Sequence, residues 1–362
     1  MRKCSILMLA VLLLTYGYRG FRDMYLFIND DVKVKTSGRL SDIAIQSLPV
    51  RLETPDSGVF RQVKHVQKDG NHLFMIADSR LLQYDISGKF IRQLAITAAH
   101  EGGTEHEALW IANYTLDTDL HQVIAVDSQR NIRKYDYAGN CLATFRLHQF
   151  WSQMTGLLYH KGSLWITAEN IEANDDVQTR YQIVHRLYRF DAGMNEISHQ
   201  PLFFADVGRD RVPCSYIVDE LLADEYGVYA YASPIDMDLL LSDTLAVVLR
   251  QDLPRLSKSG NIGQACIYPV RKGKRHLIAT NYQAVDNLYA FCYDKVSHTA
   301  YVLSDGFKDD FHQTGYVSDL QSLDAQNESY CYIKSGAALG QQFPGSENEA
   351  SCPILFIVTL KS

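Results

Sequence analysis

The densest group of side chains that could bind a metal or transfer a proton lies within one short segment of the chain. It consists of His100, Glu101, His106 and Glu107. Imidazole nitrogen and carboxylate oxygen are both ligands of divalent metal ions. The metalloprotease pattern HExxH needs its histidines four residues apart on one helix, whereas these two are six apart across Gly102 and Gly103. We therefore interpret the segment as a polar loop, with a binding or metal site in it as the alternative.

Other patterns that mark enzyme sites are missing from the sequence. No G-x-S-x-G nucleophile motif occurs, and the segment GNIG at 260–263 lacks the length and the lysine of a phosphate-binding loop. Glu172, Asp175 and Asp176 form an acidic stretch that could bind a cation such as calcium, although carboxylates in a solvated insertion are the more ordinary interpretation. We predict no cofactor, with a divalent cation as the alternative.

One strongly basic run, RKGKRH at 271–276, could contact an acidic glycan or phospholipid head groups. Its position between two strand-like segments favours the tip of a β-hairpin instead. No aromatic residues interleave the run, as single-stranded nucleic-acid binding would favour. The 35 Lys and Arg against 42 Asp and Glu give a net charge of -7, which also disfavours a nucleic-acid partner.

The beginning of the chain is typical of an export signal. Arg2 and Lys3 precede an apolar run at 5–14, which is too short to span a bilayer as a helix. We predict a signal peptide at 1–17, with approximate cleavage after Gly17, and a lead-in segment at 18–42. An uncleaved anchor is the alternative, and a lipid anchor is not supported because Cys4 precedes the apolar run. We expect a periplasmic or envelope-associated protein with no transmembrane segment in the mature chain.

The cysteines do not form an obvious metal or redox motif, since none belongs to a CxxC pair. Most lie in apolar, strand-like runs, where a thiol behaves as a small apolar side chain. Structural free thiols are favoured, and one or more disulfides remain open in an oxidising compartment. The six cysteines after the signal are Cys141, Cys214, Cys266, Cys292, Cys331 and Cys352.

A repeat organises the chain. Residues 72–94 align with residues 122–147: Asp78 and Asp127 each end an apolar strand 49 residues apart, and Gly88 and Gly139 lie 51 residues apart. A period near 50 with strands separated by turns is typical of a β-propeller. The repeated aspartates are expected to accept hydrogen bonds from turn amides, and the glycines to adopt positive φ.

Fainter copies of the unit extend to the C-terminus and suggest six blades in one domain at 43–362. A ring must close, or its end strands expose unpaired edges. We predict an all-β, six-bladed β-propeller closed by pairing of the strand at 43–53 with the terminal segment PILFIVTLK. The 22 tyrosines are then expected to pack within strands and between blades.

The order of these motifs resembles a six-bladed β-propeller family of exported bacterial proteins, related in shape to NHL-type propellers. The resemblance implies a six-bladed ring and export rather than an activity. The chain departs from the family in AAHEGGTEHEALW at 98–110, which lacks the proline and tyrosine of a G-x-G-P-G-E-Y-like loop, and in having no lipoprotein cysteine. The matching segments are LPVRLETPD at 48–56, the block at 78–90, SDTLAVV at 242–248, FKDDF at 307–311 and CPILFIVTLK at 352–361.

Three functions fit these observations. The favoured one is a binding or scaffolding module that uses loops on one face and the central channel, with an unknown protein or carbohydrate ligand. The second is a metal-dependent hydrolase or lyase with its site at the channel mouth. The third is a structural component of an envelope assembly. We lean against an enzyme and expect a monomer.

Overall fold

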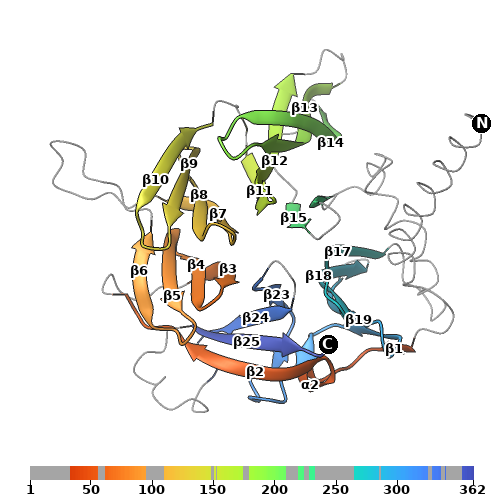
Figure 1. The fold of residues 1–362 in the computed structure, drawn as a ribbon. Coiled ribbons are helices and arrows are strands. Elements are labelled where there is room, and N and C mark those ends of the chain that lie inside the picture. Colours follow the sequence, from red (N-terminus) through yellow and green to blue (C-terminus); the bar gives the residue numbers. More distant parts are fainter. Residues whose placement is uncertain are drawn as a thin grey trace, which may run out of the picture.

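The structure is a computed structural model, and it describes most of the chain after residue 32. The described residues are 33–55, 62–94, 110–147, 151, 153–173, 179–208, 219–223, 228–232, 265–284, 287–324, 328–335, 339 and 353–362. Antiparallel sheets follow one another around a ring, as Figure 1 shows. The chain is thus a β-propeller, as the repeat predicted.

Three blades take their four strands from consecutive segments of the chain. Blade I contains β3 (Val63–Asp69), β4 (His72–Ala77), β5 (Arg80–Asp85) and β6 (Phe90–Leu94). Blade II contains β7 (Ile111–Asp117), β8 (Gln122–Asp127), β9 (Asn131–Asp136) and β10 (Cys141–Arg146). Blade III contains β11 (Gln153–His160), β12 (Ser163–Ala173), β13 (Thr179–Phe190) and β14 (Glu196–Gly208).

The other two blades each include a strand from the N-terminal part of the chain. Blade IV contains β17 (Ala265–Lys272), β18 (His276–Ala284), β19 (Asn287–Asp294), β20 (Thr299–Leu303) and β1 (Lys33–Lys35). Blade V contains β23 (Gln321–Ser322), β24 (Ser329–Lys334), β25 (Ile354–Leu360) and β2 (Ala44–Arg51). A small sheet of β21 (Phe307–Lys308) and β22 (Tyr316–Val317) lies in the connection between them.

The described residues form five complete blades, one fewer than the six that the sequence predicted. The predicted fourth unit contributes only β15 (Asp219–Ala223) and β16 (Val228–Ala232), a two-stranded sheet. The segment SDTLAVV at 242–248, which the sequence suggested as a further strand, lies outside the described residues. Two paired strands leave two of the usual four positions of a blade unfilled by described residues.

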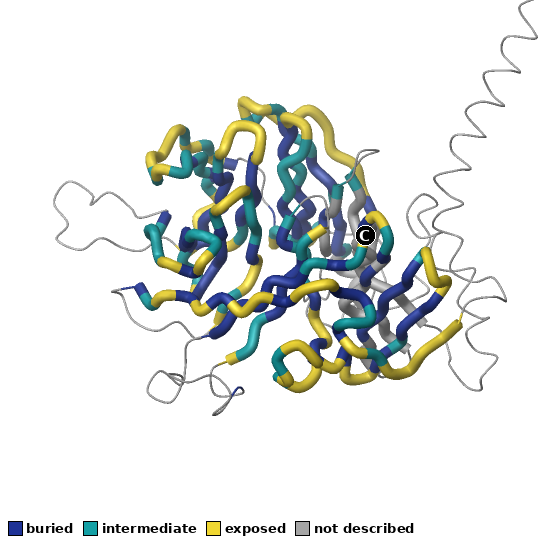
Figure 2. The backbone as a smooth tube through the Cα atoms, turned by 60° about the horizontal axis from the view of Figure 1, so that its bottom comes forward, coloured by how far each residue is buried: buried dark blue, intermediate teal, exposed yellow. Residues whose placement is uncertain are grey.

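Apolar layers between neighbouring blades form the core. Between blades I and II, for example, Phe74 and Ile76 pack with Tyr114 and Val123, all of them fully buried. Each middle strand is covered on both faces, which explains why β4 is an almost continuous apolar run rather than an alternating one. Figure 2 shows buried stretches running along the strands and exposed residues gathering at the turns.

The ring is closed by the predicted pairing of the two ends of the chain. β2 is antiparallel to β25, and Val50 lies opposite Leu355. Leu52 follows β2 and joins the buried layer between blades V and I, together with Val66 and Leu73. The closing strand therefore contributes both backbone hydrogen bonds and core side chains.

The N-terminal segment also joins blade IV, which the sequence did not suggest. β1 is parallel to β20, with Lys35 opposite Tyr301. The one-turn helix α2 (Leu40–Ile43) then buries Leu40 and Ile43 in the apolar layer between blades IV and V. Residues 33–51 thus connect the last two blades by pairing with both.

Aspartates at strand ends stabilise turns, as predicted for Asp127, which accepts the amides of Gln129 and Asn131. The carboxylate of Asp78 instead accepts the amide of Gln62, just before β3. The Asp85 carboxylate accepts hydrogen bonds from the amides of Ser87 and Lys89. Asp136 does the same for the amide of Asn140, and Asp191 for that of Asn195. Because these carboxylates are already used by backbone donors, they are structural groups and not a catalytic set.

Gly88 and Gly139 offer a matched test of ring closure. Both have positive φ, so alanine costs roughly 1–2 kcal/mol at either position. A Cβ at Gly88 would lie 2.2 Å from the carbonyl oxygen of Arg51 in the closing strand, whereas at Gly139 it would meet only the flexible side chains of Arg92 and Leu94. We expect Gly88→Ala to lower the free energy of unfolding by about 1–3 kcal/mol more than Gly139→Ala. Urea unfolding of both variants measures this, and equal losses would contradict it.

Truncation tests the contribution of β1. A chain that starts at Arg39 loses the pairing of β1 with β20 but keeps α2 and β2. We expect it to be roughly 1–3 kcal/mol less stable than a chain that starts at Lys33, because several backbone hydrogen bonds and the contact of Lys35 with Tyr301 are lost. Thermal unfolding of the two chains provides the measurement, and identical midpoints would show that β1 adds nothing.

Candidate functional site

The antiparallel blades create two different faces. The turns that join the first strand to the second and the third to the fourth lie at one end of each blade, which we call the hairpin face. The turns between the second and third strands, and the connections between blades, lie at the other end, which we call the loop face. In blade I the hairpin face carries residues 70–71 and 86–89, and the loop face carries residues 78–79.

Trp110 stands on the loop face at the junction of blades I and II. It precedes the inner strand β7, and 69% of its surface is exposed. Its carbonyl accepts a hydrogen bond from the amide of Ser128 at 2.8 Å, and the next amide, of Ile111, donates to the carbonyl of Ser79 at 2.8 Å. The backbone is therefore held by turns of both blades while the indole remains accessible.

The two turns beside Trp110 are themselves rigid. The buried carboxylate of Asp127 accepts hydrogen bonds from the amides of Gln129 and Asn131, each at 2.9 Å, and from Nε of Arg133 at 3.2 Å. In blade I, Asp78 and Gln62 are joined by two hydrogen bonds that involve their backbones. An accessible indole between such turns is preorganised for contact with a ligand.

The hairpin face of the same two blades holds a histidine beside a carboxylate. His121 Nδ1 lies 3.0 Å from Oδ2 of Asp69, and the Tyr137 hydroxyl donates to the same oxygen at 2.7 Å. Burial, and then the bond to Asp69, raises the pKa of Tyr137, which keeps it a neutral donor. In the described part of the chain the His121 ring is bonded to Asp69 alone. The group has an oriented base but no hydroxyl or thiol nucleophile bonded to it.

Blade III contains a second histidine–carboxylate pair that is shut off from solvent. Nε2 of His185 and Oε1 of Glu169 are 2.5 Å apart, and both side chains are almost completely buried. They lie opposite each other on adjacent strands β13 and β12. The pair joins the outer and inner halves of the blade, and a position this deep favours a structural role.

The structure describes only some of the candidate site residues that the sequence singled out. His100, Glu101, His106 and Glu107 lie outside the described residues, as do Asp175 and Asp176. Glu172 of the acidic stretch is described, and it forms an ion pair with Arg186 at 2.5 Å. Among the described residues, no group of three or more His, Cys, Asp or Glu is arranged to hold a metal ion.

The basic run forms the predicted hairpin between β17 and β18. Two of its charges are paired: Lys274 with Glu328, and Arg275 with Asp294 through two bonds of 2.9 and 2.8 Å. Burial opposes ionisation of Asp294, yet the bonds from Arg275 and Ser297 hold its pKa well below the usual range. The charges of Lys274 and Arg275 are therefore neutralised by local ion pairs.

Sequence reasoning missed the link between Asp69 and His121 because the two residues are 52 positions apart. A signal was nevertheless present. Asp69 and Asp117 both end the inner strand of their blade, just before the turn. Each of the two carboxylates forms a hydrogen bond with the hydroxyl of a tyrosine from the next blade. Tyr137 bonds to Asp69, and Tyr159 bonds to Asp117.

Three cysteines can be placed with their side chains. None of the three forms a disulfide: Cys292 and Cys331 are buried and Cys141 is exposed. Burial raises the pKa of Cys292, so it remains an unreactive thiol. The described residues contain no helix with the length and apolar character needed to cross a membrane.

Comparison with known proteins gives similarities among solved structures only. No family model matches the sequence, and neither does any curated protein. A predicted exported protein from Bacteroides fragilis has a similar structure, with a TM-score of 0.52 and 16% identity over 91% of this chain and 100% of that one. The Cps50 (Swd1) β-propeller domain from Myceliophteria thermophila matches with a TM-score of 0.39 and 10% identity over 87% of this chain and 100% of its own. The protein is an all-β propeller module.

The bond from Tyr137 to Asp69 is expected to contribute to packing of blades I and II. A hydrogen bond to a charged, mostly buried acceptor is worth roughly 1.5–3 kcal/mol, so Tyr137→Phe should lower the free energy of unfolding by about that amount. Tyr316→Phe is the matched control, because that tyrosine is 52% exposed and should change stability little. Urea unfolding measures both, and equal effects would show that the inter-blade bond is not stabilising.

Proposed function

We propose that this protein is an exported β-propeller binding module, and that Trp110 on the loop face contacts its ligand. The single observation that carries the proposal is that a tryptophan anchored by hydrogen bonds from two blades leaves 69% of its surface exposed. Burying an indole on folding is strongly favourable. An indole that is held exposed therefore leaves apolar surface available for contact with a ligand. Tryptophan is also among the residues that contribute most to binding where a ligand covers it.

Carbohydrate is the ligand class that we place first. Trp110 is a single flat apolar surface whose backbone neighbours are polar turn residues, including Ser79 and Ser128. A sugar ring has one apolar face and a rim of hydroxyl groups, so it matches an aromatic platform surrounded by hydrogen-bonding groups. A protein partner of ordinary affinity would instead need a broad apolar patch around the indole.

Two features support export and placement in the envelope. The basic start and short apolar run at 1–17 are those of a signal peptide. The structural relative from Bacteroides fragilis is named as a predicted exported protein. On this proposal the module works in the periplasm or on the envelope, where glycans are abundant.

We further propose that the ring is six-bladed and NHL-like, with β15 and β16 as the inner half of the blade between III and IV. β15 contacts the inner strand β11 just as β11 contacts β7. Leu221 of β15 packs with Leu187 and Leu202 of blade III in a buried cluster of the kind that joins the complete blades. A crystal structure would test this, and a ring closed by five sheets would overturn it.

Tryptophan fluorescence provides a direct test of the ligand site. The chain has three tryptophans, of which Trp151 is buried and Trp165 is half-buried against Arg189. Iodide quenching should therefore report mainly on Trp110. An oligosaccharide array identifies a binding sugar, and that sugar should then protect the wild-type protein from quenching.

The variant Trp110→Ala is expected to bind the sugar at least about 30-fold more weakly, the effect of losing a binding contact worth roughly 2 kcal/mol. Leu142→Ala is the matched control, because Leu142 is 50% exposed on the outer strand β10 and should leave affinity unchanged. Binding by Trp110→Ala with wild-type affinity would remove Trp110 from the site. Failure of every oligosaccharide on the array to bind would overturn the carbohydrate class.

A further inference from the structure

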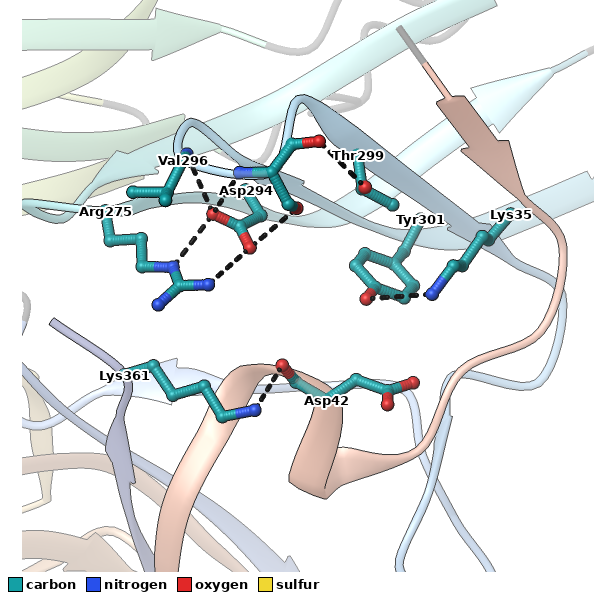
Figure 3. A network of polar contacts seen from close by, with 9 residues as sticks. Lys35, Asp42, Arg275, Asp294, Val296, Thr299, Tyr301 and Lys361 are labelled. Carbon is teal, nitrogen blue, oxygen red and sulfur yellow. Dashed lines mark hydrogen bonds and ion pairs between the residues drawn. The ribbon is translucent and has the colours of Figure 1, made fainter.

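The two ends of the chain meet at one corner of the ring, between blades IV and V. The Lys361 ammonium, just after β25, donates to the carbonyl of Asp42 in α2 at 2.9 Å, and its amide donates to the carbonyl of Ile43 at 2.9 Å. Figure 3 shows Lys361 and Asp42 below the hairpins of blade IV that carry Arg275 and Asp294. We call this corner the closure seam.

His276 is buried beside the closure seam, and no described residue forms a hydrogen bond with its ring. It is 1% exposed. It begins β18 and lies directly opposite Asp294 on β19, so both side chains are on the same face of the blade. An unpaired buried imidazole is tolerated only while it is neutral, since an isolated buried charge costs several kcal/mol.

The charged groups around His276 are mostly cations. Arg275 and Lys274 come from its own hairpin, Lys295 from the next hairpin, and Lys361 from the end of the chain. The Lys274 charge is paired with Glu328. The one nearby carboxylate of blade IV, Asp294, already accepts two bonds from Arg275 and two from Ser297.

The remaining groups at the seam do not supply a counter-ion. The Asp42 carboxylate accepts the amide of Arg39 within the helix cap. Lys35 contacts the Tyr301 ring and hydroxyl. A proton added to His276 would therefore create a buried cation next to Arg275, Lys295 and Lys361, and the neighbouring carboxylate that attracts it, Asp294, is already shared with Arg275 and Ser297.

We propose that His276 is an acid-sensitive latch that holds residues 33–43, which contain β1 and α2, in the ring when neutral and releases them when protonated. Protonation repels Lys361, and Lys361 is the residue that bonds to α2 through both its ammonium and its amide. Loss of those bonds frees α2 and weakens the seating of β1 on blade IV. This proposal is independent of the ligand site at Trp110.

The direction of the pH dependence follows from burial. Desolvation lowers the pKa of His276 to about 4 in the closed ring, because it outweighs the opposing charge of Asp294 and is reinforced by the neighbouring cations Arg275, Lys361 and Lys295. Once the seam opens, the ring returns toward its ordinary pKa of about 6.5. The open form therefore binds the proton more tightly, and the closed form loses stability as the pH falls from about 6.5 toward 4. Between pH 7.5 and 4.5 the opening equilibrium should increase on the order of 100-fold.

Hydrogen–deuterium exchange of the full mature chain tests the latch. After correction for the intrinsic effect of pH on exchange, peptides from residues 33–43 should exchange faster at pH 4.5 than at pH 7.5, whereas peptides from β2, β8 and β9 should not. The variant His276→Gln cannot be protonated and should keep the segment protected at pH 4.5. His199→Gln is the matched control, because the His199 side chain is 54% exposed on β14 of blade III and its loss should leave acid opening intact.

Equal acceleration in wild type and His276→Gln would overturn the proposal, and so would simultaneous exposure of β8 and β9, which would indicate global acid unfolding. If His276→Gln does not fold, histidine NMR resonances of the wild-type chain give the same decision. A His276 resonance that titrates reversibly below pH 6 together with the loss of protection at 33–43 supports the latch. A midpoint near 6.5 with the segment still protected contradicts it.

Discussion

The antiparallel pairing of β2 with β25 is the constraint on which the rest of the structure depends. Without it, β25 would present an unpaired edge, and blade V would lose the side chains that seal it against blade I. The apolar layers lie between blades rather than within one, so each is complete only when both of its neighbours are held in place. A local pairing of two chain ends therefore stabilises layers on every side of the ring.

Tyrosines are the main polar link between the blades. Tyr114 donates its hydroxyl to the carbonyl of Phe74 in blade I at 2.6 Å, and Tyr137 and Tyr159 each bond to an aspartate of the preceding blade. Burial raises the pKa of all three, to about 12 for Tyr159. They consequently remain neutral donors over the physiological range. The tyrosine-rich composition is a consequence of this packing and does not by itself indicate a partner surface.

Most of the acidic groups that could suggest a catalytic or metal site are already occupied. Asp85, Asp127, Asp136, Asp191 and Asp294 accept hydrogen bonds from the amides of their own turns. Few groups of the described part are then left for a ligand, and they are of two kinds. Trp110 is fixed but exposed, and His276 is buried but unpaired. The first is suited to contact with a ligand, and the second to sensing protons.

The sequence by itself determined the features that depend on local patterning. Alternating strands, the Asp and Gly positions of the turns, the propeller fold and the pairing of 43–53 with the terminal strand all follow from residues whose spacing repeats about every 50 positions. Only the tertiary structure decided the extra pairing of β1, the number of complete blades, the meeting of Asp69 with His121, and the burial of His276 among lysines. The contacts behind them join residues as far as 52, 266 and 319 positions apart, and no local spacing records which residues come into contact. The charge and burial around a side chain depend on its neighbours in space. The exposure of Trp110 and the burial of His276 are therefore decided only when the ring has closed.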